Sequence, residues 1–136
     1  MKHVANCYKK YADFTGRATR REFWLFILFV NITNGFLLLC SLIATLLYAH
    51  IKPPIQPLIV LLIFTPSILF TLANMIPSYA VGARRLHDAG FSGWLQLLSP
   101  IPFLNLVLII FFCLESVCGP NQYGADPFGR PPLPKY

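Results

Sequence analysis

The feature that most constrains this chain is a set of three long stretches that contain no Asp, Glu, Lys or Arg. They lie between Glu22 and Lys52, over residues 53–83 and over residues 89–114. Each is longer than the ~20 residues that an apolar α-helix needs to cross a bilayer core. Only 12% of the 136 residues are charged, whereas about 25% are charged in an average soluble domain. Too little charge remains to cover a soluble helical core, so the sequence predicts an integral membrane protein.

The predicted fold is an all-α membrane protein, a bundle of three transmembrane helices that forms a single domain over residues 1–136. The first apolar stretch is too long for a signal peptide, whose apolar core is about 7–15 residues, so it is expected to stay as a span. The expected order is a basic segment, three spans, and a loop with a Pro-rich tail, over residues 1–22, 23–47, 58–81, 94–114 and 115–136.

The third of these segments carries two prolines, Pro100 and Pro102, close to its start. A proline inside a helix removes a hydrogen bond and clashes with the preceding turn. The uninterrupted stretch that follows, residues 103–117, is short for a complete crossing. The third segment is therefore either a full span with a break at these prolines or a re-entrant segment that returns the tail to its starting side.

Lys and Arg are distributed unevenly between the expected connections. Six of the eleven lie in residues 1–22, Arg84 and Arg85 follow the second span, and Lys52 alone follows the first. Because cytoplasmic loops carry the excess of Lys and Arg, the N-terminus is expected in the cytoplasm. Three complete spans place the tail outside, whereas a re-entrant third segment places it in the cytoplasm.

The first two spans each carry polar residues at helical spacing on one face. The residues of these polar stripes are Asn31, Asn34, Ser41 and Thr45 in the first span, and Ser67, Thr71, Asn74 and Ser78 in the second. Polar side chains in hydrocarbon turn toward protein partners, and consecutive spans are antiparallel. The two stripes are therefore expected to face each other and to bind by hydrogen bonds, with a conduit for an ion or solute as the alternative.

The start of the first span has the pattern of a helix N-terminus at a membrane surface. Thr19 and Glu22 have the spacing of a capping box, in which the hydroxyl binds the Glu22 amide and the carboxylate returns to the Thr19 amide. Trp24 follows at the position of a headgroup-level anchor. Arg20 and Arg21 lie in the first turn, where free amides and guanidinium groups together suit a phosphate.

The end of the second span carries a second group of boundary signals. Arg84 and Asp88 are four residues apart and are expected to pair on one helical face. Gly90 suits a left-handed helix stop, Ser92 is expected to cap the third segment, and Trp94 marks the interface again.

His87 beside Asp88 allows an acid–base interpretation, to which Glu115 and Asp126 are candidate additions. No Ser or Cys nucleophile accompanies the pair at a recognisable spacing, so catalysis is the weaker hypothesis. The four cysteines and three histidines do not have the spacing of metal ligands. No metal, no cofactor and no nucleic-acid partner is therefore expected.

Three boundary motifs occur in order around the apolar stretches. They are Phe14-Thr-Gly-Arg-Ala-Thr-Arg-Arg-Glu-Phe-Trp24, Arg84-Arg-Leu-His-Asp88 with Ser92-Gly-Trp94, and the turn-rich Gly119-Pro-Asn-Gln-Tyr-Gly-Ala-Asp-Pro127, which holds Asn121, Tyr123, Gly124, Asp126 and Pro127. The chain thereby resembles the domain-of-unknown-function 805 family of small bacterial inner-membrane proteins over residues 8–128. Gln122 and Leu95 depart from that family's usual residues. The resemblance implies a multi-pass protein of the bacterial inner membrane, but it does not indicate which activity the protein has.

The functional hypothesis from the sequence is a non-catalytic binding or adaptor module. Its candidate site is a cytoplasmic arginine cluster for anionic lipid headgroups or an acidic partner, formed by Arg17, Arg20, Arg21, Arg84 and Arg85. A second copy of the chain or another membrane protein is the expected protein partner. The alternatives are a small oligomeric transporter that uses the polar stripes, and a membrane enzyme that uses His87 and Asp88.

Overall fold

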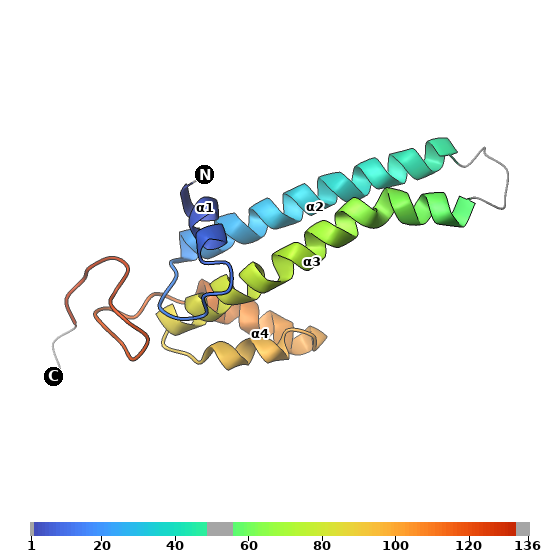
Figure 1. Cartoon of the computed structure of the whole chain (residues 1–136). Helices are drawn as coiled ribbons and strands as arrows, with labels where there is room; N and C mark the ends of the chain where they lie inside the picture. The colour runs from blue at the N-terminus through green and yellow to red at the C-terminus, as the bar shows by residue number, and fades with distance from the viewer. Residues whose placement is uncertain (1, 49–55, 133–136) are drawn as a thin grey trace. The chain divides into compact units, whose positions relative to one another are not determined.

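The computed structural model describes residues 2–48 and 56–132, and within them the chain is helical with turns and loops but without a strand. The elements are α1 (Lys2–Lys9), α2 (Arg20–Tyr48), α3 (Gln56–Asp88), the 3-10 helix η1 (Gly93–Leu98) and α4 (Pro102–Cys113), as labelled in Figure 1. The all-α prediction is confirmed for this part of the chain. Lys52 and the last four residues of the Pro-rich tail lie outside the described residues.

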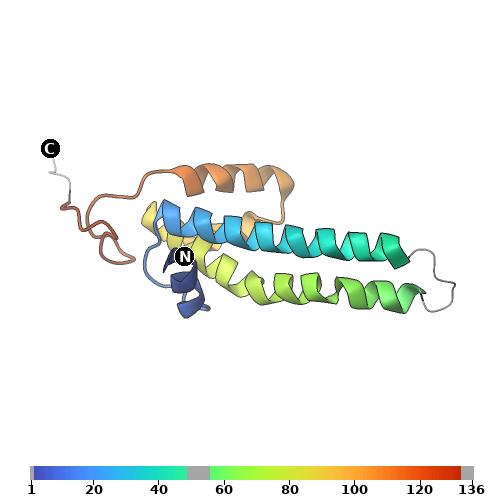
Figure 2. The same ribbon diagram turned by 90° about the horizontal axis from the view of Figure 1, so that it is seen from above.

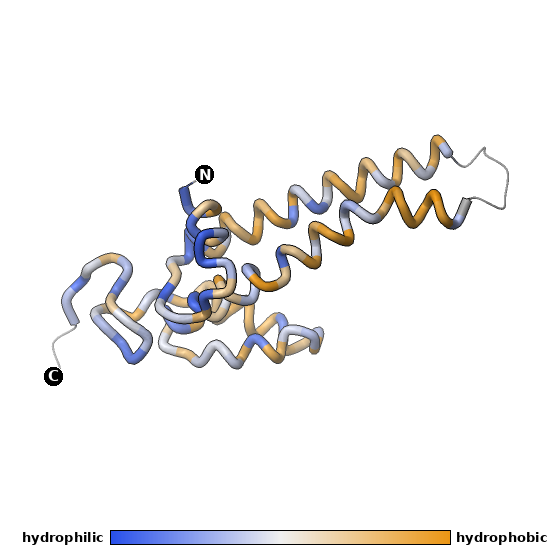
Figure 3. Tube along the Cα trace, viewed as in Figure 1, coloured by the Kyte–Doolittle hydropathy of each residue, from blue (hydrophilic) through white to orange (hydrophobic). Residues whose placement is uncertain are grey.

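Helices α2 and α3 contain the first two predicted spans. Their candidate membrane-spanning portions, Arg20–Tyr48 and Pro57–Asp88, have 29 and 32 residues. At a rise of about 1.5 Å per residue each is longer than the ~30 Å hydrocarbon core. Figure 3 shows that most of their length is coloured as apolar. The structure therefore has two helices that are long and apolar enough to cross a membrane.

The third predicted span is not a single helix. It consists of η1 and the twelve-residue α4, which is only about 18 Å long. Pro102 opens α4, where a missing amide costs nothing, and Ile101 before it is extended with φ −90° and ψ 114°. Proline disfavours a helical conformation in the residue that precedes it. The structure therefore has no continuous helix over residues 94–114, and the break at Pro100 and Pro102 is confirmed. Whether this segment crosses the membrane stays a prediction.

The chain divides into two compact units. The polar unit comprises Met1–Phe26 and Ile76–Tyr136, and the hairpin unit comprises Ile27–Met75. All nine described Lys and Arg residues belong to the polar unit. The single domain expected from the sequence stays a prediction.

Within the hairpin unit, one member of the polar stripes joins the two helices. The hydroxyl of Ser41 donates to the carbonyl of Ile63 at 2.9 Å. Most other stripe residues donate to the carbonyl four positions earlier in their own helix; these are Asn31, Thr45, Thr71 and Asn74. Such bonds satisfy a polar side chain in hydrocarbon without a neighbouring helix.

The burial of the stripe residues divides them further. Ser41, Ser67 and Asn74 are buried, whereas Asn31 and Thr71 are exposed. Ser78 belongs to the polar unit, and Asn34 is half-buried in the hairpin unit. The expectation that the two stripes face each other stays a prediction.

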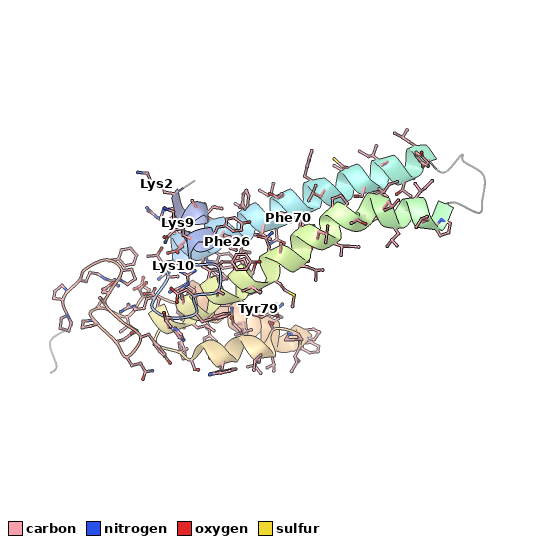
Figure 4. The ribbon with its side chains drawn as sticks, viewed as in Figure 1. Lys2, Lys9, Lys10, Phe26, Phe70 and Tyr79 are labelled. Atoms are coloured by element: carbon pink, nitrogen blue, oxygen red, sulfur yellow. The ribbon has the colours of Figure 1, made fainter. Side chains whose placement is uncertain are left out.

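The interior of the polar unit is built from aromatic and small apolar side chains. Tyr8 of α1 meets the fully buried Phe26 of α2 edge to face, with 5.4 Å between ring centroids, and Figure 4 labels Phe26 at this place. Phe23 lies against Phe112 of α4 at 4.3 Å. Aromatic pairs of this kind add about 0.5–1.5 kcal/mol beyond their burial. Together they join α1, the start of α2 and the end of α4.

Candidate functional site

Asp88, the last residue of α3, is the centre of a buried polar cluster. Its carboxylate is fully buried and accepts hydrogen bonds from Arg17 Nε at 2.9 Å and Arg85 Nη1 at 2.6 Å. The hydroxyl of Ser116 donates to the same carboxylate. A buried carboxylate needs partners of this kind, because an isolated charge in a low-dielectric interior is very costly. This cluster joins the segment before α2, the end of α3 and the segment after α4.

The guanidinium of Arg17 binds three acceptors from two parts of the chain. Besides Asp88, it donates through Nη1 to the carbonyl of Gly119 at 2.7 Å and through Nη2 to that of Val117 at 2.6 Å. Only a planar guanidinium presents donors in several fixed directions at once. Arg17 therefore ties the loop after α4 to the loop before α2.

Arg85 binds the C-terminal end of α4. Its Nε donates to the carbonyl of Phe112 at 3.0 Å, and its Nη2 donates to the carbonyl of Leu114. The last carbonyls of a helix lack partners within the helix and carry a partial negative charge. A cation at this point satisfies both needs, so Arg85 fixes the end of α4 beside the end of α3.

Glu22 forms the centre of a second cluster. The hydroxyl of Thr19 accepts from the Glu22 amide at 3.2 Å, which confirms the first half of the predicted capping box. The Glu22 carboxylate accepts instead from Asn6 Nδ2 at 3.0 Å and from the Cys7 thiol at 3.7 Å. The return to the Thr19 amide is therefore wrong, because side chains of α1 bind this carboxylate.

Arg84 belongs to the Glu22 cluster and not to the Asp88 cluster. Its Nη1 lies 3.6 Å from Glu22 Oε1, and its Nε donates to the carbonyl of Ala80 at 3.3 Å. The predicted Arg84–Asp88 pair is wrong, because Arg85 binds Asp88 from one residue further along α3. Arg84 is fully buried.

Cys7 is a buried thiol that we expect to be unreactive in this environment. Burial, reinforced by the negative charge of Glu22, raises the pKa of Cys7 from 9.0 to about 12. Because the thiolate is the nucleophile, Cys7 should not react with a maleimide at neutral pH in the folded protein and should react after denaturation. The half-buried Cys118 is the internal control. Mass spectrometry of labelled peptides measures both sites, and equal labelling of the two in the folded protein contradicts the prediction.

The signals that end α3 and begin η1 are confirmed. Gly90 has a φ of +86°, and its amide donates to the carbonyl of His87 while the Phe91 amide donates to that of Leu86. This is the bond pattern of a Schellman stop. The hydroxyl of Ser92 accepts from the Trp94 amide at 3.4 Å, as a helix cap.

The two tryptophans keep exposed side chains. Trp24 is 38% exposed and Trp94 is 78% exposed. Amphipathic rings that are exposed at the ends of apolar segments are typical of the membrane–water interface. Their role as anchors stays a prediction.

His87 binds other partners than its neighbour Asp88. The Nδ1 atom lies 3.2 Å from the carbonyl of Gly16, and the ring stacks on Tyr123 at 3.8 Å with an interplanar angle of 5°. The His87 carbonyl accepts from Asn121 Nδ2 at 2.8 Å. His87 therefore contacts both the loop before α2 and the loop after α4.

The loop after α4 is held by two side chains that bind its own backbone. Asn121 accepts from the Tyr123 amide at 2.9 Å, and the backbones of Asn121 and Gly124 exchange two bonds of 3.0 Å. Asp126 accepts from the amides of Gly119 and Phe128 at 3.2 and 2.9 Å. These are the turns that the sequence predicts at Asn121, Gly124 and Asp126 with Pro127.

A further ion pair closes this loop on its C-terminal side. Arg130 Nε donates to Asp126 Oδ2 at 2.8 Å, and this bond lowers the pKa of Asp126 to about 2. Arg130 Nη2 also donates to the carbonyl of Ser116 at 3.2 Å. Residues 116–130 therefore form an ordered loop beside the Asp88 cluster.

The predicted arginine cluster separates into buried and exposed members. Arg17, Arg84 and Arg85 are buried and bind acceptors of the chain itself. Arg21 is exposed, and the side chain of Arg20 is 41% exposed and lies 3.4 Å from the exposed Glu115. Headgroup or partner binding by these residues stays a prediction. Of the five, Arg20 and Arg21 have charges that a ligand can reach.

Exposed cations of α1 extend this accessible charge. Lys2, Lys9 and Lys10 are exposed on or just after α1 (Figure 4). The Asn6–Glu22 hydrogen bond places α1 against the first turn of α2. We call the accessible cations of these two helix ends the basic surface; they are the exposed Lys2, Lys9, Lys10 and Arg21 and the partly exposed Arg20.

Opposing charge near the basic surface is sparse. Three of the five acidic residues, Glu22, Asp88 and Asp126, are buried and pair with arginine. Asp13 and Glu115 are the two that remain. The accessible charge of the described part of the polar unit is therefore strongly positive.

Several residues of the Asp88 and Glu22 clusters were not predicted from the sequence. Ser116, Asn6 and Cys7 were not expected to bind the carboxylates of Asp88 and Glu22. Their spacing along the chain gives no local pattern, since these contacts join residues at least 15 positions apart. The charges in three separate motifs favour a meeting of those motifs in space, but this signal does not extend to Asn6, Cys7 and Ser116, which lie outside the motifs.

Comparison with known proteins gives a consistent result. The family model described as "Protein of unknown function (DUF805)" matches residues 11–125. Inner membrane protein YhaI of Escherichia coli (strain K12) is 36% identical over 128 residues, which cover 93% of this chain and 96% of that protein. Inner membrane protein YhaH of the same strain is 37% identical over 123 residues, which cover 88% and 90%. No solved structure matches the chain.

Proposed function

Because this chain belongs to the DUF805 family and its relatives are inner membrane proteins, we propose that it is a non-catalytic membrane protein that binds anionic lipid headgroups through its basic surface. The observation that carries this proposal is the separation of the charges in the polar unit. Buried arginines bind the buried carboxylates, and of the accessible cations of α1 and α2 only Arg20 has an acidic partner in the described residues, the exposed Glu115.

The free energy of electrostatic attraction between a few cations and an anionic membrane surface is large enough to support headgroup binding. Each Lys or Arg close to an anionic leaflet contributes about 1 kcal/mol. Helix α1 carries three of these cations on or beside it, and its contact with the start of α2 keeps them at one end of a candidate span. Arg20 and Arg21 also lie in the first turn of a helix, where free amides favour a phosphate.

The alternatives receive less support from the contacts. A transporter needs polar groups that are free to receive a solute, and four stripe residues bind carbonyls of their own helices. An enzyme that uses His87 with Asp88 needs their side chains to cooperate. The His87 ring binds the Gly16 carbonyl, whereas the Asp88 carboxylate binds Arg17, Arg85 and Ser116.

The test uses tryptophan fluorescence in bilayers. The chain has two tryptophans. Replacing Trp94 with phenylalanine leaves Trp24, which lies next to the basic surface, as the remaining tryptophan. Quenching by brominated phosphatidylglycerol relative to brominated phosphatidylcholine measures the lipid preference. Lys2→Gln, Lys9→Gln and Lys10→Gln together should lower the preference for phosphatidylglycerol by at least about tenfold.

Lys52→Gln in the same background is the control, because it removes a charge from the connection between α2 and α3. It should leave the preference at Trp24 unchanged. Raising the salt concentration should weaken the preference in the starting protein more than in the triple variant, in which only Arg20 and Arg21 of the basic surface remain. An unchanged preference in the triple variant rejects headgroup binding by α1 and leaves an acidic protein partner as the interpretation of the basic surface.

A further inference from the structure

The segment between α3 and the C-terminal loop begins and ends at the same place. The amide of Val117 donates to the carbonyl of Asp88 at 3.0 Å, and Ser116 donates to the Asp88 carboxylate. The chain therefore leaves the end of α3, forms η1 and α4, and returns to the residue from which it departed. Figure 2 shows α4 running back toward the loop that follows it, with the turn from η1 at its far end.

Two further contacts fix this return. Arg85 binds the last carbonyls of α4 at Phe112 and Leu114, and η1 lies against α4. When α3 spans a membrane, as its length and composition allow, both ends of residues 89–116 lie on the side where α3 ends.

The surface of this segment is apolar. Residues 89–114 contain no charged side chain, and Trp94 and Phe103 are 78% and 83% exposed. Other large apolar side chains that are exposed here are Leu97, Ile101, Leu106, Val107, Ile109 and Ile110. A contiguous surface of this kind needs an apolar environment.

The backbone at the turn between η1 and α4 is suited to such an environment. Pro100 and Pro102 have no amide hydrogen to satisfy. The amides of Ser99 and Ile101 donate to the carbonyls of Gln96 and Leu98 at 2.9 and 3.0 Å. Irregular backbone is costly in hydrocarbon because its polar groups lack partners, and here these donors are either absent or bonded.

We propose that residues 89–116 form a re-entrant hairpin whose exposed side chains insert among the lipid acyl chains of one leaflet. The chain then crosses the membrane twice, and its N-terminal segment and C-terminal loop lie on the same side. The continuity of the hairpin with α3, the absence of charge and the bonded turn favour lipid over a protein as the occupant. This inference is independent of headgroup binding by the basic surface.

The first experiment determines the side of the C-terminal loop. Single cysteines replace Lys10, Lys52 and Gln122, in turn, in a full-length background with Cys40, Cys113 and Cys118 removed and the buried Cys7 kept. A membrane-impermeant maleimide is applied to right-side-out and to inverted vesicles. Lys10→Cys and Gln122→Cys should label from the same side, and Lys52→Cys from the other. Labelling of Gln122→Cys together with Lys52→Cys overturns the proposal.

The second experiment measures insertion. Phe103→Trp and Phe128→Trp are compared in the Trp24→Phe, Trp94→Phe background, since Phe128 is an exposed aromatic residue of the C-terminal loop. Phe103→Trp should be quenched by lipids brominated on the acyl chain and protected from aqueous acrylamide, and Phe128→Trp should show the reverse. Acrylamide quenching of both rejects insertion. Protection of Phe103→Trp from both quenchers also overturns the proposal and indicates that a second copy of the chain covers the hairpin.

Discussion

Replacing Asp88 with alanine should lower the free energy of unfolding by about 3–5 kcal/mol, because it leaves two buried guanidinium groups without their counter-charge. Arg17 and Arg85 have side chains that are 1% and 0% exposed, and both bind the Asp88 carboxylate. Neither can turn to water without breaking its bonds to backbone carbonyls, which belong to the segment after α4 for Arg17 and to the end of α4 for Arg85. The midpoint of denaturant unfolding of the purified protein in detergent, followed by circular dichroism, measures the loss.

Asp13→Ala is the matched control for Asp88→Ala. The Asp13 carboxylate accepts from the amide and hydroxyl of Thr15 at 3.0 and 2.6 Å at an exposed position. Its removal should cost about 1 kcal/mol or less. Asp88→Asn, which keeps an acceptor but loses the charge, should lie between the two. Equal stability of Asp88→Ala and Asp13→Ala shows that the Asp88 cluster is not a buried network.

Replacing Arg17 with lysine should free the loop after α4, although the charge is conserved. Arg17 holds Asp88, Val117 and Gly119 with three different nitrogens, whereas an ammonium group is a compact charge on a flexible stem. At least one charge-assisted bond to a carbonyl is lost, which costs about 1.5–3 kcal/mol. Hydrogen exchange followed by mass spectrometry should show faster exchange over residues 117–130.

Arg20→Lys provides the comparison for Arg17→Lys. The ion pair of Arg20 with Glu115 is solvent-exposed at both ends, and such pairs contribute about 0–1 kcal/mol. Exchange over residues 117–130 should therefore stay unchanged in Arg20→Lys. Similar exchange in the two variants contradicts the role assigned to Arg17.

Local signals in the sequence account for the parts of the fold that were predicted correctly. The two long helices follow from uninterrupted apolar stretches, and the Gly90 stop, the Ser92 cap and the amide bond to Thr19 follow from residues within four positions of one another. The break before α4 follows from Pro102, which acts on its immediate neighbours. Each of these features depends on backbone geometry that one or two side chains determine.

The pairing of the charges was not predictable in the same way. Asp88 has an arginine three and an arginine four positions earlier, and both spacings bring side chains onto the same face of a helix. Arg85 binds Asp88, while Arg84 lies beside Glu22, 62 positions away along the chain. The packing of α1 and α4 in the polar unit determines which of the two arginines binds Asp88. No sequence pattern within α3 indicates that packing.

The large sequence separation between Arg17 and the residues that it binds also affects the order of events during synthesis. The carbonyls that Arg17 binds belong to residues 100 and 102 positions later, so a ribosome has made most of the protein before they exist. Until then Arg17 lacks these acceptors, and we expect its charge to add to the positive charge that biases a nascent membrane protein toward one orientation. We therefore expect the same guanidinium to contribute first to the orientation of the emerging chain and later, once it pairs with Asp88, to hold the segment after α4 in place.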